Sequence, residues 1–317
     1  MDNLTHTLTG LALSRAGLNR WHAHPTLVLV LAANAPDIDI AMLFRGQLTY
    51  FENHRGITHS VFVAPVLGLL AALLACAIGR TMRGWKAAWC LGVAGVASHL
   101  LLDWTNSYGV RLLLPLSAQW FRLDLNGLNE LWITAALLIA WLGPLLGRLV
   151  STEIGAKPGS GRGLAIFALS FFLLYDFGRY LTHQRVIDTL NSRVYQGGPP
   201  LRVAAFPSSA ANPFHWTGWI ERPDFSMRFS MNVLADFDPT AGTTIYKPEP
   251  SPALDAARQA YPVQKFLEFA QFPMWQVIPV SDPEGAHRVD VRDWRFPFTA
   301  SATVDQSNRL IASSFHY

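Results

Sequence analysis

The sequence predicts a multi-span α-helical membrane domain over residues 1–185, followed by an α+β extramembrane domain over residues 186–317. Half of the 317 residues are hydrophobic and only 15% are charged, a balance that is unusual for a soluble chain. The apolar excess lies in the first part of the chain, whereas Pro, Asp, Arg and aromatic residues are scattered through the second part. We therefore expect about four transmembrane helices, preceded by N-terminal helices that lie in the membrane interface.

Four segments have the length and polarity of bilayer-spanning helices, which need about 20 mostly apolar residues. They are residues 57–79, 85–102, 131–150 and 163–181. Two earlier apolar stretches, residues 4–18 and 25–44, are interrupted by His6, Arg15, Pro36, Asp37 and Asp39. We expect these two stretches to be interfacial helices, with a full span as the alternative.

The basic residues beside the spans predict the orientation, because short cytoplasmic loops are enriched in Lys and Arg. One side of the membrane receives Arg80, Arg83, Lys86, Arg148, Lys157 and Arg162. We expect that side to face the cytoplasm of a bacterial inner membrane, which places the C-terminal domain on the periplasmic side. The expected periplasmic side also carries Arg15, Arg20, Arg45 and Arg55, which weaken the asymmetry.

The segment beyond residue 181 has the pattern of a separate α+β domain. Stretches such as "HWTGWIE", "FSMRFSMNVL" and "HRVDVRDWRF" have the alternation or β-rich content of strands, and Pro, Gly and Asp turns separate them. Residues 253–270 are expected to be helical, with an interruption at Pro262. We find no Ser/His/Asp set, Gly-rich phosphate loop or His-Glu-x-x-His zinc helix in this domain. Its expected role is to cover a site or to select a substrate.

Charge and cysteine content exclude two classes of site. The net charge of +3 comes without a Lys/Arg run, so nucleic acid is not an expected partner. Cys76 and Cys90 both lie in or beside apolar segments, which leaves neither a disulfide framework nor a cysteine-based zinc site. The expected partners are membrane lipids, and the oligomeric state stays open.

Polar residues from three separate segments are expected at one level of one leaflet. His54 and His59 in "HRGITHS" begin the first predicted span, and His99 and Asp103 share one face at the end of the second. The N-terminal stretches add His6 and, in "NAPDID", Asp37 and Asp39. Imidazoles and carboxylates are the ligands of Zn²⁺, Mn²⁺ and similar ions. Because ionisable residues at membrane depth are costly, their convergence favours a metal site.

Each motif also has a simpler interpretation. The pair His99 and Asp103 can be a hydrogen-bonded pair within one helix, and Asp37 after Pro36 suits the start of a helix. Arg55 can anchor the chain at the lipid headgroups.

Together these motifs resemble a known family. Thr5-His6, "PDID", "HRGITHS" and "SHLLLDWTNSYGVRLLLP" resemble the bacterial inner-membrane metal-dependent hydrolases of the YdjM-like type, over about residues 1–185 and weakly into "FPSSAANPFHW". The order of the ligands is more distantly similar to that of the helical zinc-dependent phospholipase C and single-strand nuclease group. Those enzymes carry a further downstream ligand that has no clear match in this chain, which leaves the number of ions open.

The resemblance and the residues together imply a hydrolase that acts at the external membrane interface on a phosphoester or lipid-linked, amphiphilic substrate. The expected cofactor is one or two divalent ions, Zn²⁺ first and Mn²⁺ or another transition metal as the alternative, which would activate a water. The expected ligands are His6, Asp37, Asp39, His54, His59, His99 and Asp103. The expected catalytic residues are Arg55, which would bind an anionic oxygen, and Asp39, which is either a ligand or an acceptor that orients a histidine. A membrane protein with a purely structural metal, or a metal or solute transporter, is the alternative.

Overall fold

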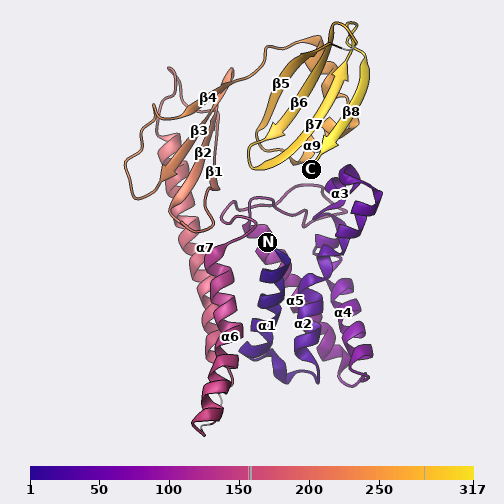
Figure 1. Cartoon of the computed structure of the whole chain (residues 1–317), viewed down its shortest axis with the longest axis vertical. Helices are drawn as coiled ribbons and strands as arrows, with labels where there is room; N and C mark the ends of the chain where they lie inside the picture. Colours follow the sequence, from indigo (N-terminus) through magenta and orange to yellow (C-terminus); the bar gives the residue numbers. More distant parts are fainter. Residues whose placement is uncertain (156, 158, 282) are drawn as a thin grey trace.

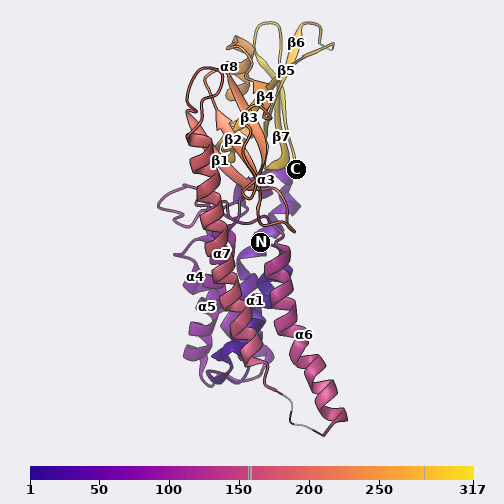
Figure 2. The same cartoon turned by 90° about the vertical axis from the view of Figure 1, so that its left-hand side faces the viewer.

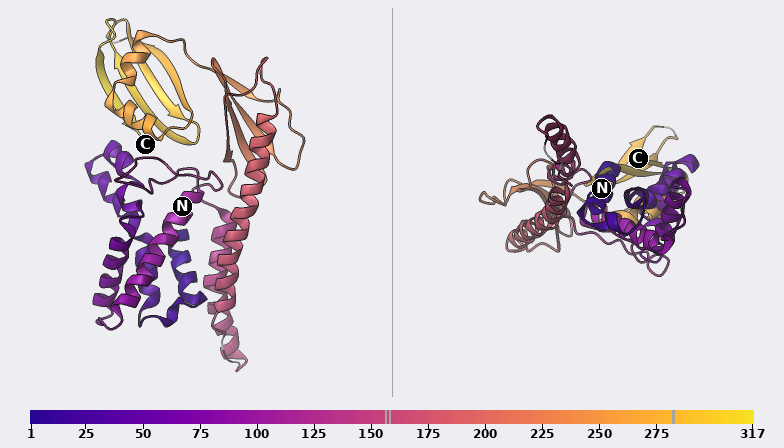
Figure 3. Two further views of the ribbon diagram at one scale, coloured as in Figure 1. Left: turned by 180° about the vertical axis from the view of Figure 1, so that it is seen from behind. Right: turned by 90° about the horizontal axis from the view of Figure 1, so that it is seen from below.

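The computed structural model describes residues 1–155, 157, 159–281 and 283–317. Its helical part contains α1 (Asn3–Ala16), α2 (Pro25–Asn34), α3 (Gln47–Asn53), α4 (Ala64–Ile78), α5 (Trp85–Thr105), α6 (Leu131–Glu153) and α7 (Arg162–Asn191). Helices α1, α2, α4 and α5 pack side by side, and the α6–α7 pair lies along α1 (Figure 1). Seen from below, the pair stands to one side of the other four helices (Figure 3).

Small residues bring α5 into close contact with its two neighbours. A Cβ atom added to Gly92 would lie 2.1 Å from the backbone oxygen of Gly68 in α4, and one added to Gly95 would lie 2.7 Å from Cβ of Ala32 in α2. Such close backbone approach through Gly and Ala is the usual way in which membrane helices pack without a hydrophobic driving force. The helix that carries His99 and Asp103 is therefore fixed against α2 and α4. Asp37 follows α2 in the sequence, and His59 precedes α4.

The expected membrane spans are confirmed in number. Among the described residues, four helical segments are long and apolar enough to cross a membrane: Pro25–Arg45, Trp85–Thr105, Leu131–Glu153 and Arg162–Asn191. The last three correspond to the predicted segments 85–102, 131–150 and 163–181. A fifth span results if the bent pair Gln47–His59 and Ala64–Ile78 counts as one.

Two details differ from the sequence interpretation. Residues 25–44 were expected in the interface, but α2 and the 3₁₀ helix η2 (Ala35–Arg45) together have the length of a span, and α2 packs inside the bundle. The reason is that the apolar residues of α2 come before Asp37 and Asp39, which lie in η2, so no charged residue interrupts α2. The predicted span 57–79 is not one straight helix: α4 covers only Ala64–Ile78, and it is bent by 85° from the preceding helical segment Gln47–His59.

The contacts of the turn between α1 and α2 change the predicted positions of two basic residues. Nε of Arg162, at the start of α7, donates to the backbone oxygen of Ala16 at 3.0 Å, and Gly79 after α4 lies against His24. Arg15 and Arg20 were expected on the periplasmic side, but they flank this turn. They therefore lie at the same end of the bundle as Arg80 and the other basic loop residues.

The C-terminal part consists of two antiparallel four-stranded sheets with helices between them, in agreement with the predicted α+β domain. The first sheet has the order β1 (Arg202–Pro207), β2 (His215–Glu221), β3 (Phe225–Asn232) and β4 (Thr243–Tyr246). The second has the order β5 (Pro273–Val280), β6 (Ala286–Asp293), β7 (Phe296–Val304) and β8 (Leu310–His316). Between the sheets in sequence lie α8 (Pro252–Arg258) and α9 (Tyr261–Phe269), and Pro262 stands at the start of α9.

Both sheets are attached to the same end of the helical bundle. Helix α7 extends beyond the bundle, and its residues Val186 and Leu190 belong to the core of the first sheet (Figure 2). Phe51 of α3 belongs to the core of the second sheet, with its ring centroid 4.6 Å from that of Phe315 and 5.3 Å from that of Phe269. The helical domain thus supplies part of the hydrophobic core of each sheet, which fixes both sheets over one end of the bundle.

Phe51→Ala should loosen the second sheet, because it leaves a cavity in an aromatic core. We expect the free energy of unfolding to fall by about 3–5 kcal/mol, the usual cost of removing a buried Phe side chain. Thermal unfolding and limited proteolysis of the full chain in detergent would measure it. Phe44→Ala is the matched control, because Phe44 is 96% exposed and its removal should change little. Equal stability of the two variants would contradict the docking role of Phe51.

Candidate metal centre

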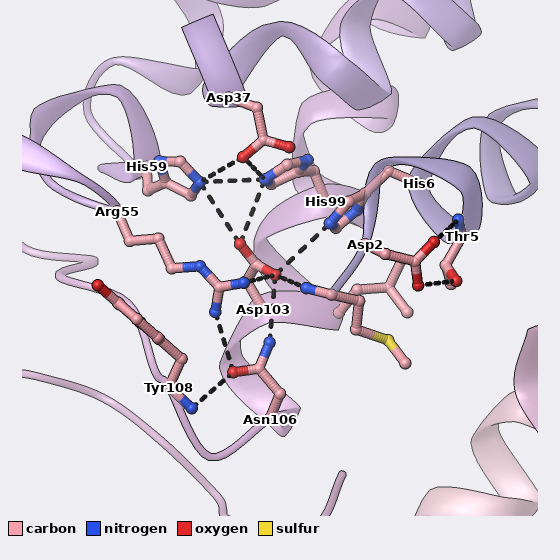
Figure 4. Close-up of polar contacts among 12 residues, drawn as sticks. Asp2, Thr5, His6, Asp37, Arg55, His59, His99, Asp103, Asn106 and Tyr108 are labelled. Atoms are coloured by element: carbon pink, nitrogen blue, oxygen red, sulfur yellow. Dashed lines mark hydrogen bonds and ion pairs between the residues drawn. The ribbon is translucent and has the colours of Figure 1, made fainter. Parts of the chain in front are cut away.

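Four polar side chains from three segments meet at the end of the bundle that faces the sheets (Figure 4). Asp37 comes from η2, His59 from the 3₁₀ helix η3 (Ile57–His59), and His99 and Asp103 from α5. One nitrogen or carboxylate oxygen from each of the four lies within 4.8 Å of all the others. His59, His99 and Asp103 are buried, and the Asp37 side chain is 16% exposed.

The spacing of these four atoms suits a tetrahedral metal ion. Nε2 of His59 lies 3.1 Å from Nε2 of His99, and these nitrogens lie 3.4 and 3.3 Å from Oδ2 of Asp103. Both nitrogens lie 3.6 Å from Oδ1 of Asp37. A zinc ion with ligand bonds of about 2.0–2.1 Å separates its tetrahedral ligands by about 3.3–3.4 Å. The distances between the candidate ligand atoms given above, from 3.1 to 3.6 Å, fall on both sides of that separation.

The surrounding hydrogen bonds turn ligand atoms toward the centre. Nδ1 of His99 lies 2.7 Å from the backbone oxygen of Ala33, which can only accept, so Nδ1 carries the proton and Nε2 presents a lone pair. Nδ1 of His59 faces the Thr58 hydroxyl at 3.0 Å and Oδ2 of Asp39 at 3.5 Å. A proton on that nitrogen leaves two imidazole lone pairs and two carboxylates facing one another, an arrangement that a bound cation stabilises.

Buried polar atoms without hydrogen-bond partners also support a metal ion at this position. Oδ2 of Asp103 and both ring nitrogens of His6 are buried without a hydrogen-bond partner among the described residues. Burying such atoms unsatisfied costs free energy, which a metal ion in contact with them would offset. The His6 ring stacks on that of His99 at a centroid distance of 3.7 Å, and its Nε2 lies 3.5 Å from Oδ1 of Asp103. His6 therefore lies beside the four-atom group and is the candidate ligand of a second ion.

Arg55 holds the second oxygen of Asp103. Its Nη2 lies 3.0 Å from Oδ1 of Asp103, and its Nη1 donates to Oδ1 of Asn106 at 2.9 Å. The amino group of Met1 and Nδ2 of Asn106 also donate to Oδ1 of Asp103. Arg55 is only 3% exposed, and its guanidinium lies 4.8 Å from the centroid of the Tyr108 ring. Arg55 thus orients a candidate ligand, although the sequence suggested a contact with substrate.

Asp39 and His54 form a pair outside the four-atom group. Oδ1 of Asp39 lies 3.1 Å from Nδ1 of His54, and Oδ2 of Asp39 accepts from the backbone N–H of Arg55 at 2.9 Å. The backbone of Arg55 has φ of 52°, a conformation that few residues other than glycine adopt. This turn directs Arg55 toward Asp103 and leaves His54 beside Asp39. Of the seven expected ligands, the structure groups Asp37, His59, His99 and Asp103, whereas His6, Asp39 and His54 lie around them.

A cavity of about 420 Å³ borders the metal centre. Its walls include Asp37, Asp39, His54 and Arg55 from the helical domain. Four residues of the second sheet region form another part of the wall: Phe296, Pro297, Phe298 and Tyr317. The sequence contains no signal for these four residues, since they are remote from the motifs and carry none themselves.

A second polar group lies on α7. Asp176 and Arg179 are three residues apart, a spacing that favours an ion pair within one helix, but Oδ1 of Asp176 accepts from Nδ2 of Asn126 at 2.7 Å. Nε of Arg179 donates to the backbone oxygen of Leu125 at 2.8 Å, and its guanidinium lies over the Trp216 ring. Nearby, burial raises the pKa of Glu130, which accepts from the Tyr175 hydroxyl at 2.5 Å. These contacts tie α7 to the loop before α6 and to the first sheet.

Comparisons with known proteins agree with this architecture. The sequence profile of the YdjM inner membrane protein family matches residues 1–186, and the chain belongs to that family. The chain is also 24% identical to "Uncharacterized protein YfhP" of Bacillus subtilis (strain 168) over 321 residues, which cover 95% of this chain and 90% of that protein. No solved structure matches the chain significantly. The similarity to the phospholipase C and nuclease group stays a prediction.

Replacing a ligand should lower the amount of bound metal, because each candidate ligand contributes one atom to the group. We expect His59→Ala and His99→Ala to bind metal at least about tenfold more weakly, since even changes around a ligand often cost that much. Elemental analysis of the gently purified protein would measure it. His54→Ala and His215→Ala are the controls, and both should keep the metal. Full occupancy in both ligand variants, or equal loss in His54→Ala, would refute the four-atom site.

Proposed function

We propose that this chain is a membrane-bound, metal-dependent hydrolase that acts at the external membrane interface on a phosphoester or lipid-linked substrate. The observation that carries the proposal is the contact between the metal centre and the cavity. Asp37 belongs both to the four-atom group and to the cavity wall, so a ligand in the cavity reaches the metal centre directly. Ligand pockets commonly combine an apolar wall with a few convergent polar groups, as this cavity does.

The residues of the cavity wall have distinct roles in this proposal. A bound divalent ion would polarise the scissile group and lower the pKa of a water. His54, oriented by Asp39, is positioned to move a proton between that water or the leaving group and solvent. Arg55 orients Asp103 through its Nη2 atom and also lines the cavity, and its Nε has no partner among the described residues. These features support the expected contact of Arg55 with an anionic substrate oxygen.

The place of the cavity supports an amphiphilic substrate. Its wall residues come from the helical domain and from the second sheet region, and Figure 1 shows this sheet above one end of the helical bundle. A molecule anchored in the bilayer presents its headgroup at that level. A phosphoester or other lipid-linked group would reach the metal centre there while its acyl chains remain in the membrane.

The membrane orientation follows from the basic residues at the opposite end of the bundle. With Arg15 and Arg20 at that end, the charge asymmetry is stronger than the sequence alone suggested. By the preference of cytoplasmic loops for Lys and Arg, we propose that the metal centre and both sheets face the external side.

A structural metal site is the second candidate. Four protein ligands can fill a tetrahedral coordination sphere, as they do in structural zinc sites, and this favours a metal that only ties the helices together. A transporter is less well supported, because it needs polar groups along the whole path, whereas the four candidate ligands lie at one end of the bundle.

Reporter fusions would test the orientation. A reporter fused after Tyr317 should behave as external, and one inserted between α6 and α7 should behave as cytoplasmic, because basic loops remain inside. An alkaline phosphatase and a fluorescent protein, each active on one side only, give opposite readouts at the two positions. Cytoplasmic behaviour of the C-terminal fusion would place the metal centre on the inner face.

Removing the proton-transferring group should separate catalysis from metal binding. We expect His54→Gln to lower hydrolysis of a lipid phosphate by about 100-fold or more, the usual contribution of a positioned acid or base. Metal content and thermal stability should match the parent, since His54 lies outside the four-atom group. His287→Gln, on β6 and away from the cavity, should keep full activity. Undiminished hydrolysis in His54→Gln would contradict this role, and no hydrolysis by the metal-loaded parent would favour the structural alternative.

A further inference from the structure

A second cavity, of about 500 Å³, adjoins the cavity at the metal centre. The two share four wall residues, Leu128, Asn129, Phe296 and Pro297. The second cavity lies between the two sheets, since Phe206, Trp219 and Arg228 of the first sheet face Trp294 and Phe296 of the second sheet region. The two cavities are therefore neighbours that share part of one wall.

The charge of the second cavity is positive. Its wall contains Arg228 and Arg295 and no Asp or Glu. Arg295 is already neutralised, because its Nε and Nη2 donate to the two carboxylate oxygens of Asp293 at 2.9 Å each. The cation that remains is Arg228, which has no ion pair or hydrogen bond within the described residues.

The neighbours of Arg228 hold its side chain in place without neutralising it. Its cross-strand partners are Trp219 on β2 and Thr243 on β4, neither of which is acidic. Its guanidinium lies 4.3 Å from the centroid of the Trp294 ring, a cation–π contact that orients the planar group and leaves its N–H groups at the edge.

Two further donors in the same cavity lack acceptors. Trp219 is 1% exposed, and its indole Nε1 is buried without a hydrogen-bond partner. Nε1 of Trp294 is likewise buried and unpaired among the described residues. An indole N–H only donates, and neither of these donors is satisfied among the described residues. Arg228 and the two indoles thus form a set of donors, and aromatic rings line the same cavity.

We propose that this second cavity binds a phosphate group of the ligand that occupies the metal centre, at a position separate from the bond that is hydrolysed. Phosphate offers several strong acceptor oxygens, and the planar guanidinium of Arg228 matches two of them. The rings of Phe206, Trp219 and Phe296 pack against the carbon atoms that carry the phosphate. This inference rests on the proposed function and adds that the substrate carries a second phosphate-type group beyond the reacting one.

Anion binding to the full chain tests this site independently of catalysis. sn-Glycerol 3-phosphate would be titrated into the protein in phosphatidylcholine nanodiscs, after chelation of metal and in the His59→Ala background, which removes anion binding at the metal centre. Calorimetry gives the affinity. In a second arm, nanodiscs that contain phosphatidylglycerol replace the soluble phosphate, and the emission of Trp219 and Trp294 is followed by difference from Trp219→Phe and Trp294→Phe proteins.

We expect Arg228→Gln to weaken the binding of glycerol phosphate about 10- to 100-fold, which is the strength of a hydrogen bond to a charged group. Trp294→Phe keeps the ring and removes the N–H, so it should weaken binding about 3- to 10-fold. Arg292→Gln is the matched control, because Arg292 is an exposed arginine of β6 outside both cavities. Binding in the soluble arm identifies a soluble phosphate ligand, and a response only to phosphatidylglycerol identifies a lipid headgroup.

Equal affinity of Arg228→Gln and the parent in both arms, or equal weakening by Arg292→Gln, would overturn the site. If the parent binds glycerol phosphate through Arg228 but hydrolyses no lipid phosphate with metal restored, the hydrolase proposal fails and the anion site stands. If the parent and Arg228→Gln hydrolyse lipid phosphate at the same rate and Arg228 binds no phosphate, the anion site fails and the hydrolase proposal stands.

Discussion

The ion pair between Arg55 and Asp103 is the interaction on which the site depends. A carboxylate buried at membrane depth is costly unless it is paired, and Arg55 binds Oδ1 of Asp103 at 3.0 Å. The pair leaves Oδ2 of Asp103 facing His59 and His99. The contact of Oδ1 with Arg55 offsets the cost of burying the carboxylate, and Oδ2 remains for a metal ion. Arg55 reaches this position only through a turn whose backbone N–H is held by Asp39. The contacts that stabilise Asp103 therefore also attach the loop of residues 54–60 to α5, and with it His59.

All members of the four-atom group could be predicted from the sequence, because ionisable residues beside apolar segments are few and conspicuous. The sequence does not show, however, that His59 belongs to this group whereas His54 lies outside it. Both lie in one short motif, and the left-handed backbone of Arg55 between them depends on contacts with Asp39 and Asp103 from other segments. Local sequence contains no signal for that conformation, since residues other than glycine adopt it only when the surrounding structure determines it. Most of the fold was predictable for a similar reason, since hydropathy identifies spans well. It does not show whether a polar residue prevents a span, and the segment Pro25–Arg45 keeps the length of a span with Asp37 inside it.

The alternating patterns of the C-terminal part predicted strands, whereas the attachment of these strands to the helices was not predictable. Phe51 lies in a seven-residue helix and looks like an ordinary interfacial aromatic residue. Its ring nevertheless packs among Phe266, Phe269 and Phe298 in the core that the second sheet shares with α9. Such a contact joins residues more than 200 positions apart, and single-sequence reasoning depends on local periodicity. The same limit applies to the cavity walls, which combine motif residues with aromatic residues that carry no motif.

The position of the candidate metal centre at one end of the bundle reconciles two opposing costs. Ionisable groups near the middle of a bilayer would be far from any water, whereas groups at its edge lose less hydration. A centre at the edge of a bare bundle would be open to solvent on the side of Asp37, and bulk water would weaken its electrostatic interactions. The second sheet covers that side with Phe296, Phe298 and Tyr317, which form one wall of the cavity. Because Phe51 and Tyr108 of the helical domain belong to the core of that sheet, the cover is fixed in place. The membrane therefore shields the centre from one direction and the sheet from the other, so the two domains are parts of a single site.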